Sequence, residues 1–231
     1  MKAVKIIGYK NSGKSSLILE LAKIFQMKGL TVSLAKHACH PPTIPPKDER
    51  MLPHVKKYFI SSDERAILYF SLPPPLLQML TLLGSDILIL EGFKNEKYIP
   101  GIVCWKNENE KTELTSGLEI GFYGAEDWNN ASRINDLVNA IEQKGFLLPG
   151  LDCEKCNFAS CQAFAMEIIA GRKRAEDCVV LQEETKVIIN GQEIHLSPFV
   201  SHIMKQTFGG FLKSLKGVMP GKAIITMEIE T

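Results

Sequence analysis

The feature that most constrains this chain is an eight-residue loop near its start. Residues 8–15 read GYKNSGKS and match the pattern G-x-x-x-x-G-K-[ST] at every fixed position. A short apolar run at residues 4–7 precedes the loop, and apolar residues at helical spacing follow it until Gly29, so we expect strand, loop and helix. Such a loop wraps phosphate groups with its backbone N–H groups at a helix N-terminus. A glycine turn that merely joins two elements is the alternative.

The motif assigns roles to its side chains. Lys14 is expected to reach the β and γ phosphates of a nucleotide, and Ser15 is expected to hold Mg²⁺ through its hydroxyl. The motif does not choose the base, because the Asn-Lys-x-Asp stretch of guanine-specific switch GTPases does not occur in the sequence. The other nucleotide-binding residues predicted from this loop are Gly8, Lys10, Asn11, Ser12, Gly13 and Ser16.

Two further apolar runs, residues 31–35 and 86–90, predict parallel strands, because strand, helix and strand alternate along the chain. Glu91 directly follows the later strand. Ligands of such sheets bind at the carboxyl ends of the strands, so we expect Glu91 to hold Mg²⁺ through a water or to orient an attacking water. Lys14 and Glu91 are therefore the predicted catalytic residues. Asp86 lies at the opposite end of the strand and is expected to be structural.

Lys36, His37 and His40 follow the strand at residues 31–35. At that edge Lys36 is suited to neutralising a phosphate, and the histidines are suited to contacting a second anionic ligand or a metal. Ordinary polar histidines remain the alternative, because a His-x-x-His pair makes only half of a metal site. Cys39 between them is expected to be a small buried residue.

Together these motifs resemble the molybdopterin-guanine dinucleotide biosynthesis protein B family, whose members join Gly-Tyr-x-x-Ser-Gly-Lys-[Ser/Thr] to Lys-His-x-x-His and to a strand ending in Glu-Gly-Phe-Lys. All three match here in order, across residues 1–145. The resemblance implies a parallel-sheet GTP-binding domain with slow GTP hydrolysis, forming a homodimer. It also implies that Lys36 and His37 face molybdopterin, which a partner molybdopterin-guanine nucleotidyltransferase joins to GMP. The family's Gly-Lys-Asp loop is replaced here by Pro45-Pro46-Lys47-Asp48, so Asp48 is only a possible further metal-site residue.

Four cysteines define a second region with the spacing C-x₂-C-x₄-C-x₁₆-C: Cys153, Cys156, Cys161 and Cys178. A close trio and a distant fourth thiolate suit a [4Fe-4S] cluster, whose four iron corners each need one soft ligand. Zinc favours two paired knuckles and remains an alternative, as do unligated thiols. Residues 150–180 also resemble the four-cysteine iron–sulfur domain of electron-transport complex subunits and of the corrinoid iron–sulfur protein. That domain commonly has glycines where this chain has Glu154 and Asn157.

The remaining segments are predicted to be packing elements. Residues 66–85 carry no charge and are expected to form a buried helix end, a proline turn at residues 73–75 and a second helix. Asn190-Gly191 predicts a hairpin turn, and Ser197-Pro198 predicts the start of a helix whose apolar face, including Phe208 and Phe211, packs in a core. Alternation at residues 225–229 predicts a last strand.

Composition narrows the class of partner. Twenty-seven Lys and Arg against 26 Asp and Glu leave a net charge of +1, too small to favour nucleic acid or anionic lipid. The sequence predicts no signal peptide and no membrane span, and hence a cytoplasmic protein.

We therefore expect an α/β P-loop NTPase domain with a mainly parallel sheet at residues 1–148. A small C-terminal α+β part is expected to follow, with the iron–sulfur module at 149–180 and a hairpin–helix–strand unit at 181–231. Apart from GTP-dependent cofactor maturation, an iron–sulfur redox adaptor and an NTP-dependent metallochaperone remain open.

Overall fold

A computed structural model describes residues 1–38, 54–70, 72, 76–128, 130–182, 187–189 and 192–215 of the chain. Its centre is a parallel sheet with the strand order β2-β5-β1-β6-β7. The α/β class predicted from the sequence is thereby confirmed, and β1 with its phosphate loop lies in the middle of the sheet. The strands are β1 (Lys2–Gly8), β2 (Val32–Lys36), β5 (Ile87–Glu91), β6 (Gly101–Cys104) and β7 (Glu119–Tyr123).

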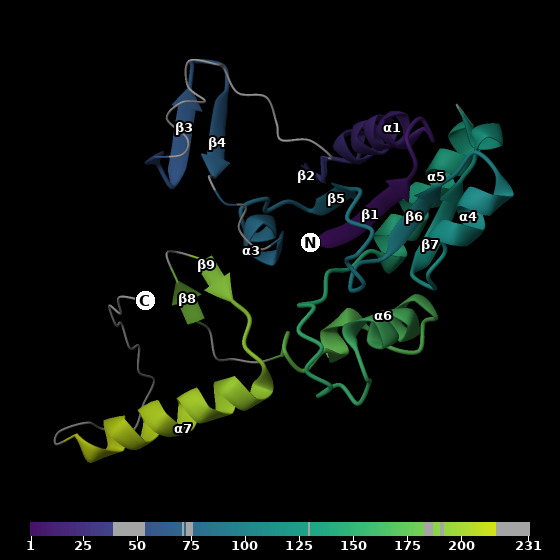
Figure 1. Ribbon diagram of the computed structural model, residues 1–231. Helices are drawn as coiled ribbons and strands as arrows, with labels where there is room; N and C mark the ends of the chain where they lie inside the picture. Colours follow the sequence, from purple (N-terminus) through teal and green to yellow (C-terminus); the bar gives the residue numbers. More distant parts are fainter. Residues whose placement is uncertain are drawn as a thin grey trace.

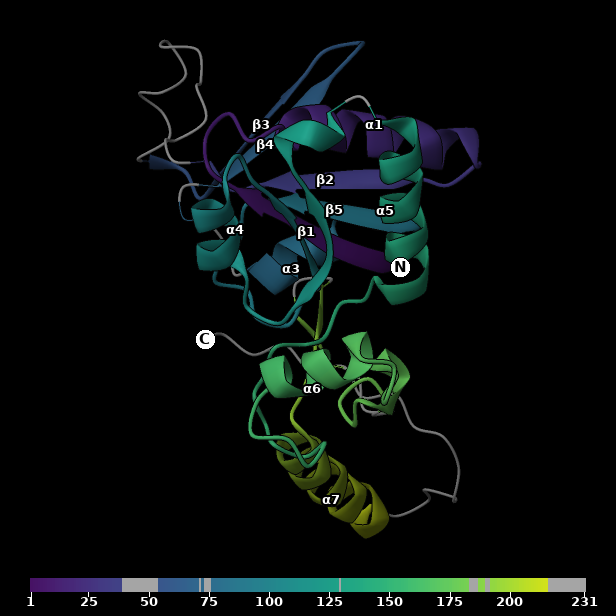
Figure 2. The same cartoon turned by 90° about the vertical axis from the view of Figure 1, so that its right-hand side faces the viewer.

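Helices cover both faces of this sheet (Figures 1 and 2). α1 (Lys14–Met27) and α5 (Ala131–Lys144) pack on one face, and α3 (Leu76–Thr81) packs on the other. Alternate residues of the buried strands serve the two faces: Ile87 and Ile89 lie under α1 and α5, whereas Leu88 and Leu90 lie under α3. Burial on both faces explains why these strands read as continuous apolar runs. α4 (Glu108–Leu114) connects β6 to β7.

The cysteine region forms a small unit around α6 (Cys161–Ile169) and the 3₁₀ turn η3 (Ala175–Asp177). Figure 2 shows α6 below the sheet. Its core joins Phe164, Cys178 and Val180 to Leu118 and Phe146, which lie next to the beginning of β7 and the end of α5. The unit is thus attached to the end of the sheet opposite the phosphate loop.

A separate antiparallel hairpin corrects one expectation. β3 (Lys57–Ser61) pairs with β4 (Ala66–Phe70) in a sheet of its own (Figure 1). Residues 66–70 were expected to be the end of a buried helix, and that prediction is wrong. Their sequence, AILYF, contains β-branched and aromatic residues that suit a strand once a partner is available. The expected second helix is present as α3, and the triple proline lies outside the described residues.

The C-terminal part contains the expected hairpin and helix. β8 (Val187–Ile189) pairs antiparallel with β9 (Gln192–Ile194), and α7 spans Pro198–Ser214. The Ser197 hydroxyl accepts a hydrogen bond from the Val200 N–H at 3.4 Å, as an N-cap should. Asn190, Gly191 and residues 225–229 lie outside the described part of the chain.

The expected burial of the α7 apolar face is not found. Phe199 is 65% exposed and Phe211 is 60% exposed, and Phe208 is only half-buried. Helical periodicity predicted the helix, but it does not specify a partner for its apolar face. No helix in the described residues combines the length and apolar character needed to cross a bilayer.

Candidate functional site

The phosphate loop joins β1 directly to α1. Asn11 and Gly13 adopt left-handed backbone conformations, with φ of 61° and 82°, which curl the chain between strand and helix. Gly8 is fixed by close packing, because a Cβ there would stand 2.5 Å from the carbonyl oxygen of Cys104 on the neighbouring strand. The loop is therefore shaped by backbone geometry and by the adjacent strand, which is the structural context that the motif requires.

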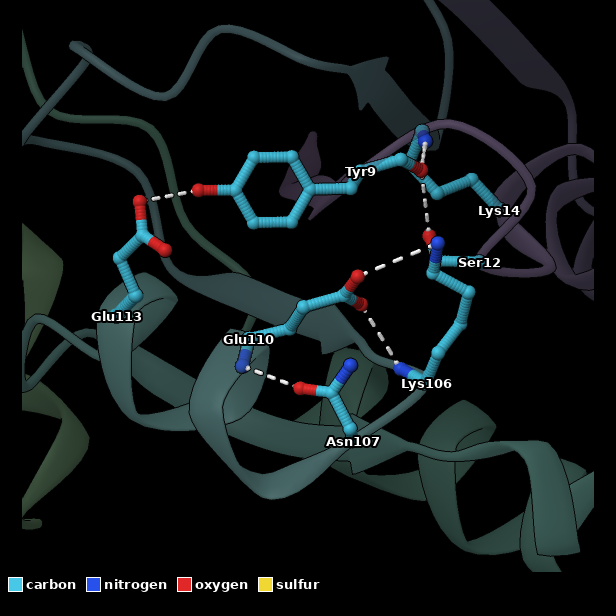
Figure 3. A network of polar contacts seen from close by, with 7 residues as sticks. All are labelled: Tyr9, Ser12, Lys14, Lys106, Asn107, Glu110 and Glu113. Carbon is cyan, nitrogen blue, oxygen red and sulfur yellow. Dashed lines mark hydrogen bonds and ion pairs between the residues drawn. The ribbon is translucent and has the colours of Figure 1, made fainter.

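Two side chains of the loop bind the same carbonyl group (Figure 3). The Lys14 ammonium donates to the Tyr9 carbonyl oxygen at 2.6 Å, and the Ser12 hydroxyl donates to it at 2.9 Å. Ser12 is completely buried, whereas Ser15 and Ser16 are exposed in the first turn of α1. Ser12 thus supports the loop from within, while Ser15 remains accessible to a ligand.

Helix α4 packs beside the loop and supplies contacts that the sequence did not predict. The Tyr9 hydroxyl donates to the Glu113 carboxylate, which raises the pKa of Tyr9, and the Lys94 ammonium lies 4.1 Å from the Tyr9 ring centroid. Lys106 follows β6 and forms an ion pair with Glu110 at 3.3 Å (Figure 3). Lys106 therefore lies at the same sheet edge as the phosphate loop, after a strand that the sequence analysis does not predict.

A signal for these residues was present in the sequence. The apolar stretch at residues 101–104 ends at a polar Asn-x-x-Glu pattern, in which Asn107 caps α4 by accepting from the Glu110 N–H at 3.0 Å.

Glu91, Lys36 and His37 lie on the other side of the loop. β2 and β5 are in register so that Lys36 pairs with Glu91, and the Lys36 ammonium lies 3.0 Å from the Glu91 carboxylate. The Glu91 side chain is 11% exposed and that of Lys36 is 55% exposed. His37 donates its backbone N–H to the Glu91 carbonyl and places its ring 5.5 Å from that of Phe93. A largely buried carboxylate beside an accessible ammonium thus flanks the phosphate loop.

Cys104 of β6 pairs with Gly8 beneath the phosphate loop and is completely buried. Burial raises the pKa of its thiol to about 12, although the nearby Lys14 ammonium opposes that shift. The thiol therefore stays protonated and is unsuited to nucleophilic or metal-ligand chemistry.

The predicted nucleotide-site residues that the structure describes thus gather at one edge of the sheet. They belong to the loop itself and to the ends of β2 and β5. Cys39, His40 and Asp48 lie outside the described residues. Asp86 lies at the opposite edge, where its carboxylate accepts from the N–H of Thr31 at 2.8 Å and from its hydroxyl at 2.7 Å, which lowers the Asp86 pKa. Its structural role is as expected.

The four cysteines of the second region line a single pocket. Apolar side chains enclose it together with the thiols, and the apolar members are Pro149, Leu151, Phe158, Phe164 and Val180. Burial raises the pKa of Cys161, and it raises that of Cys178 to about 11. The Cys156 sulfur accepts a hydrogen bond from the Val179 N–H, and Cys161 begins α6, with its N–H donating to Asp152 at 2.6 Å.

Two residues of the loop around the first two cysteines stand where similar domains commonly have glycine. Glu154 and Asn157 have φ values of 60° and 62°, so both occupy the left-handed region that glycine adopts without strain. The chain keeps the backbone path with larger residues, at a conformational cost.

The donor set fits an iron–sulfur cluster. Four thiols surround one shared pocket, and each iron corner of a cluster takes one thiolate. Zinc also accepts four thiolates and stays the alternative metal.

Comparisons with known proteins agree with this two-part arrangement. Residues 3–120, half of the chain, match the family described as "Molybdopterin guanine dinucleotide synthesis protein B", and residues 148–180 match the family described as "Putative Fe-S cluster". The chain is 29% identical over 234 residues to a Methanocaldococcus jannaschii protein named "Putative molybdopterin-guanine dinucleotide biosynthesis adapter protein", covering 97% of this chain and 96% of that one.

The fold is also similar to that of a solved structure, the MobB protein of Bacillus subtilis. The TM-score is 0.50 at 18% identity, and the similarity covers 61% of this chain and 98% of that one. At this identity the likeness concerns the fold alone.

Proposed function

Because the chain belongs to the molybdopterin guanine dinucleotide synthesis protein B family, we propose that it binds GTP with Mg²⁺ and serves as an adapter in the synthesis of molybdopterin-guanine dinucleotide. One observation carries the proposal: a complete phosphate loop lies at the same sheet edge as Glu91 and Lys36. The name of the Methanocaldococcus relative supports the adapter role.

The proposed roles of the residues follow from their positions. Backbone N–H groups of residues 10–15 and the Lys14 ammonium hold the phosphates, and the Ser15 hydroxyl with the Glu91 carboxylate holds Mg²⁺, which would neutralise phosphate charge. Lys36 leaves its ion pair with Glu91 to meet the second anionic substrate, molybdopterin, together with His37. Positioning and charge suffice for slow phosphoryl transfer, so no nucleophilic side chain is needed.

We assign a [4Fe-4S] cluster to Cys153, Cys156, Cys161 and Cys178. The shared pocket and its four thiols support this assignment, and zinc is the alternative that metal analysis would reveal. The partners proposed from the family resemblance are a molybdopterin-guanine nucleotidyltransferase and a second copy of this chain.

Calorimetric titration of the anaerobically purified full chain tests nucleotide binding. We expect Mg²⁺-GTP to bind in clear preference to Mg²⁺-ATP, and Lys14→Ala to weaken GTP binding roughly 10- to 100-fold through loss of charge-assisted hydrogen bonds. Lys23→Ala is the matched control, because Lys23 lies on the same helix but pairs with Glu20 on its exposed surface. A preference for ATP, or no nucleotide binding by folded protein, would overturn the GTP proposal.

A second assay tests the adapter role. Synthesis of the dinucleotide by the partner nucleotidyltransferase should rise on addition of the wild-type chain and should not rise with Lys14→Ala. If Lys14→Ala stimulates synthesis fully while variants of the four cysteines do not, a redox adaptor becomes the better description.

A further inference from the structure

The loop between β7 and α5 brings a tryptophan to the nucleotide edge. Trp128 follows the 3₁₀ turn η2 (Ala125–Asp127) and is 48% exposed. Its indole lies directly against the phosphate loop, because a Cβ on Gly13 would stand 2.8 Å from the Trp128 ring nitrogen and 3.3 Å from the ring carbon Cε2. An exposed aromatic ring thus adjoins the glycine that precedes Lys14.

The loop that carries Trp128 is held at several points. The Asp127 carboxylate accepts from the Gly124 N–H at 2.8 Å, and the Asn130 N–H donates to the Asp127 carbonyl at 2.9 Å. Arg133 of α5 donates to the Phe122 carbonyl at 2.9 Å, which ties the helix to the end of β7. These hydrogen bonds hold the backbone on both sides of Trp128, which favours a preorganised contact.

The two sides of the phosphate loop differ in chemistry. On the side of β5 and β2 lie Glu91 and Lys36, charged groups suited to Mg²⁺ and phosphates. On the side of β6 and β7 lie the Lys106–Glu110 ion pair, in which the two charges offset each other, and the exposed indole of Trp128. A nucleotide offers a partner to each kind of group. Its phosphates are charged, and its base presents a flat π-face that stacks on aromatic rings.

From this geometry we infer that Trp128 is the nucleobase contact of the site, stacking against the base while the phosphates lie over Lys14. This inference rests on the proposed nucleotide binding, and it adds a contact for the base to the contacts proposed for the phosphates. Every base has a π-face, so Trp128 raises affinity for nucleotides in general and does not select guanine over adenine.

Calorimetry with a ligand that lacks a base tests the inference. We expect Trp128→Ala to weaken binding of Mg²⁺-GTP and Mg²⁺-ATP by a similar factor, roughly tenfold, while Mg²⁺-tripolyphosphate binds as it does to the wild type. Trp128→Phe should retain most of the affinity, because it keeps an aromatic ring. An equal loss for GTP and tripolyphosphate would show that Trp128 only shapes the loop, and unchanged affinity for GTP would also overturn the inference.

Fluorescence provides a measurement that does not depend on truncating Trp128. The chain has two tryptophans, and the other, Trp105, is half-buried beneath the Lys111 ammonium, 4.7 Å from its ring centroid. In Trp105→Phe, where Trp128 is the only tryptophan, emission should change saturably with GTP and much less with tripolyphosphate. In Trp128→Phe, the emission of Trp105 should stay nearly constant.

The outcomes separate this inference from the function on which it rests. If the wild type binds GTP but the emission of Trp128 does not respond, the nucleobase contact is wrong and GTP binding stands. If the wild type binds neither nucleotide nor tripolyphosphate, both are wrong.

Discussion

The two ligand sites of this molecule are held in different ways. The phosphate loop lies on a sheet buried on both faces, and the residues beneath it, such as Val4, Ile6 and Leu17, are completely buried. In the cysteine region, the thiols themselves are members of the small hydrophobic cluster around Phe164. We therefore expect the first site to keep its shape without a ligand, and the small cysteine region to depend on its metal for stability.

The largest expected effect comes from removing two thiols. Cys156→Ala with Cys178→Ala should abolish the brown chromophore completely and should greatly increase hydrogen exchange in α6, because that helix then loses the ligand that organises its surroundings. GTP affinity should stay within about twofold, since the phosphate loop has a separate core. Visible absorbance, hydrogen exchange and calorimetry measure the three effects on one sample.

Cys104→Ala is the control for these thiol variants. Cys104 is a buried thiol of β6 outside the cysteine region, so its replacement should leave the chromophore intact. Loss of GTP binding in the double variant would refute the independence of the two sites. Persistence of the chromophore would refute the assignment of these cysteines as cluster ligands.

The next effect tests the rigidity of the first site. In Gly8→Ala the new methyl group would meet the Cys104 carbonyl oxygen at 2.5 Å, a backbone atom that cannot turn aside. We expect the free energy of unfolding to fall by about 3 kcal/mol and GTP affinity to fall at least tenfold. Gly84→Ala is the control, because a Cβ there meets nothing within 4 Å. Equal stabilities of the two variants in urea would mean that the loop yields more easily than its packing indicates.

Much of the first site could be predicted from local sequence. The residues that shape a phosphate loop are contiguous, so the motif identifies them directly. Glu91 ends an apolar strand, and ligands of parallel sheets bind at the carboxyl ends of the strands. Glu91 was therefore expected beside the loop, where the structure places it. Lys106 and Trp128 escaped prediction because they follow β6 and β7, two strands that the sequence analysis does not predict. Once the strand order is known, both positions follow from the same rule.

The second site was predicted through spacing, and its surroundings were not. Four cysteines with a characteristic pattern identify themselves, and the left-handed backbone at Glu154 and Asn157 agrees with the glycines of similar domains. The exposure of the α7 apolar face could not be predicted, because an apolar stripe on a helix indicates a need for a partner without specifying one. The hairpin β3–β4 was missed for a related reason, since a strand at 66–70 is defined by pairing with distant residues.

The buried ammonium of Lys5 gives a second test of the region around the phosphate loop. Lys5 in β1 is 1% exposed and donates to the Glu96 carbonyl at 2.6 Å. Burial lowers its pKa from 10.5 to about 8, and the Lys97 ammonium adds to the shift. Between these two values the unfolded chain binds a proton that the folded chain lacks, so this group makes stability rise with pH across that window. Below pH 8 its unfavourable contribution is fully present.

Lys5→Met isolates this contribution. The free energy of unfolding of the wild type, relative to Lys5→Met, should rise by roughly 2–3 kcal/mol between pH 7.5 and 10.5. Urea denaturation of both proteins at several pH values measures the difference. Parallel pH curves would show that Lys5 is hydrated in solution and that the core is looser than we describe.

The smallest effect concerns the junction between the two regions. Tyr98 lies between β5, which ends at Glu91, and β6. Its carbonyl accepts from the Leu148 N–H at 3.3 Å, and its ring packs with the cluster around Phe164. Gly150, with φ of 65°, lies against that ring, because a Cβ there would stand 2.7 Å from two ring carbons. Tyr98 also packs against the cluster around Leu88 and Leu90, so its ring connects the core of the cysteine region to that of the sheet.

Gly150→Ala should therefore loosen the cysteine region and leave the nucleotide site unchanged. Gly171→Ala is the matched control, since Gly171 has φ of 75° but nothing within 4 Å of its Cβ position. Both variants carry the strain of a left-handed alanine, roughly 1–2 kcal/mol. Displacement of the Tyr98 ring should add about 1 kcal/mol in Gly150→Ala alone.

Hydrogen exchange of α6 measures this difference between Gly150→Ala and Gly171→Ala. Equal exchange in the two variants would mean that the Tyr98 ring does not constrain the junction. An accompanying fall in GTP affinity would show that the segment from Glu91 to Tyr98 connects the two sites energetically, and the independence inferred from their separate cores would then be wrong.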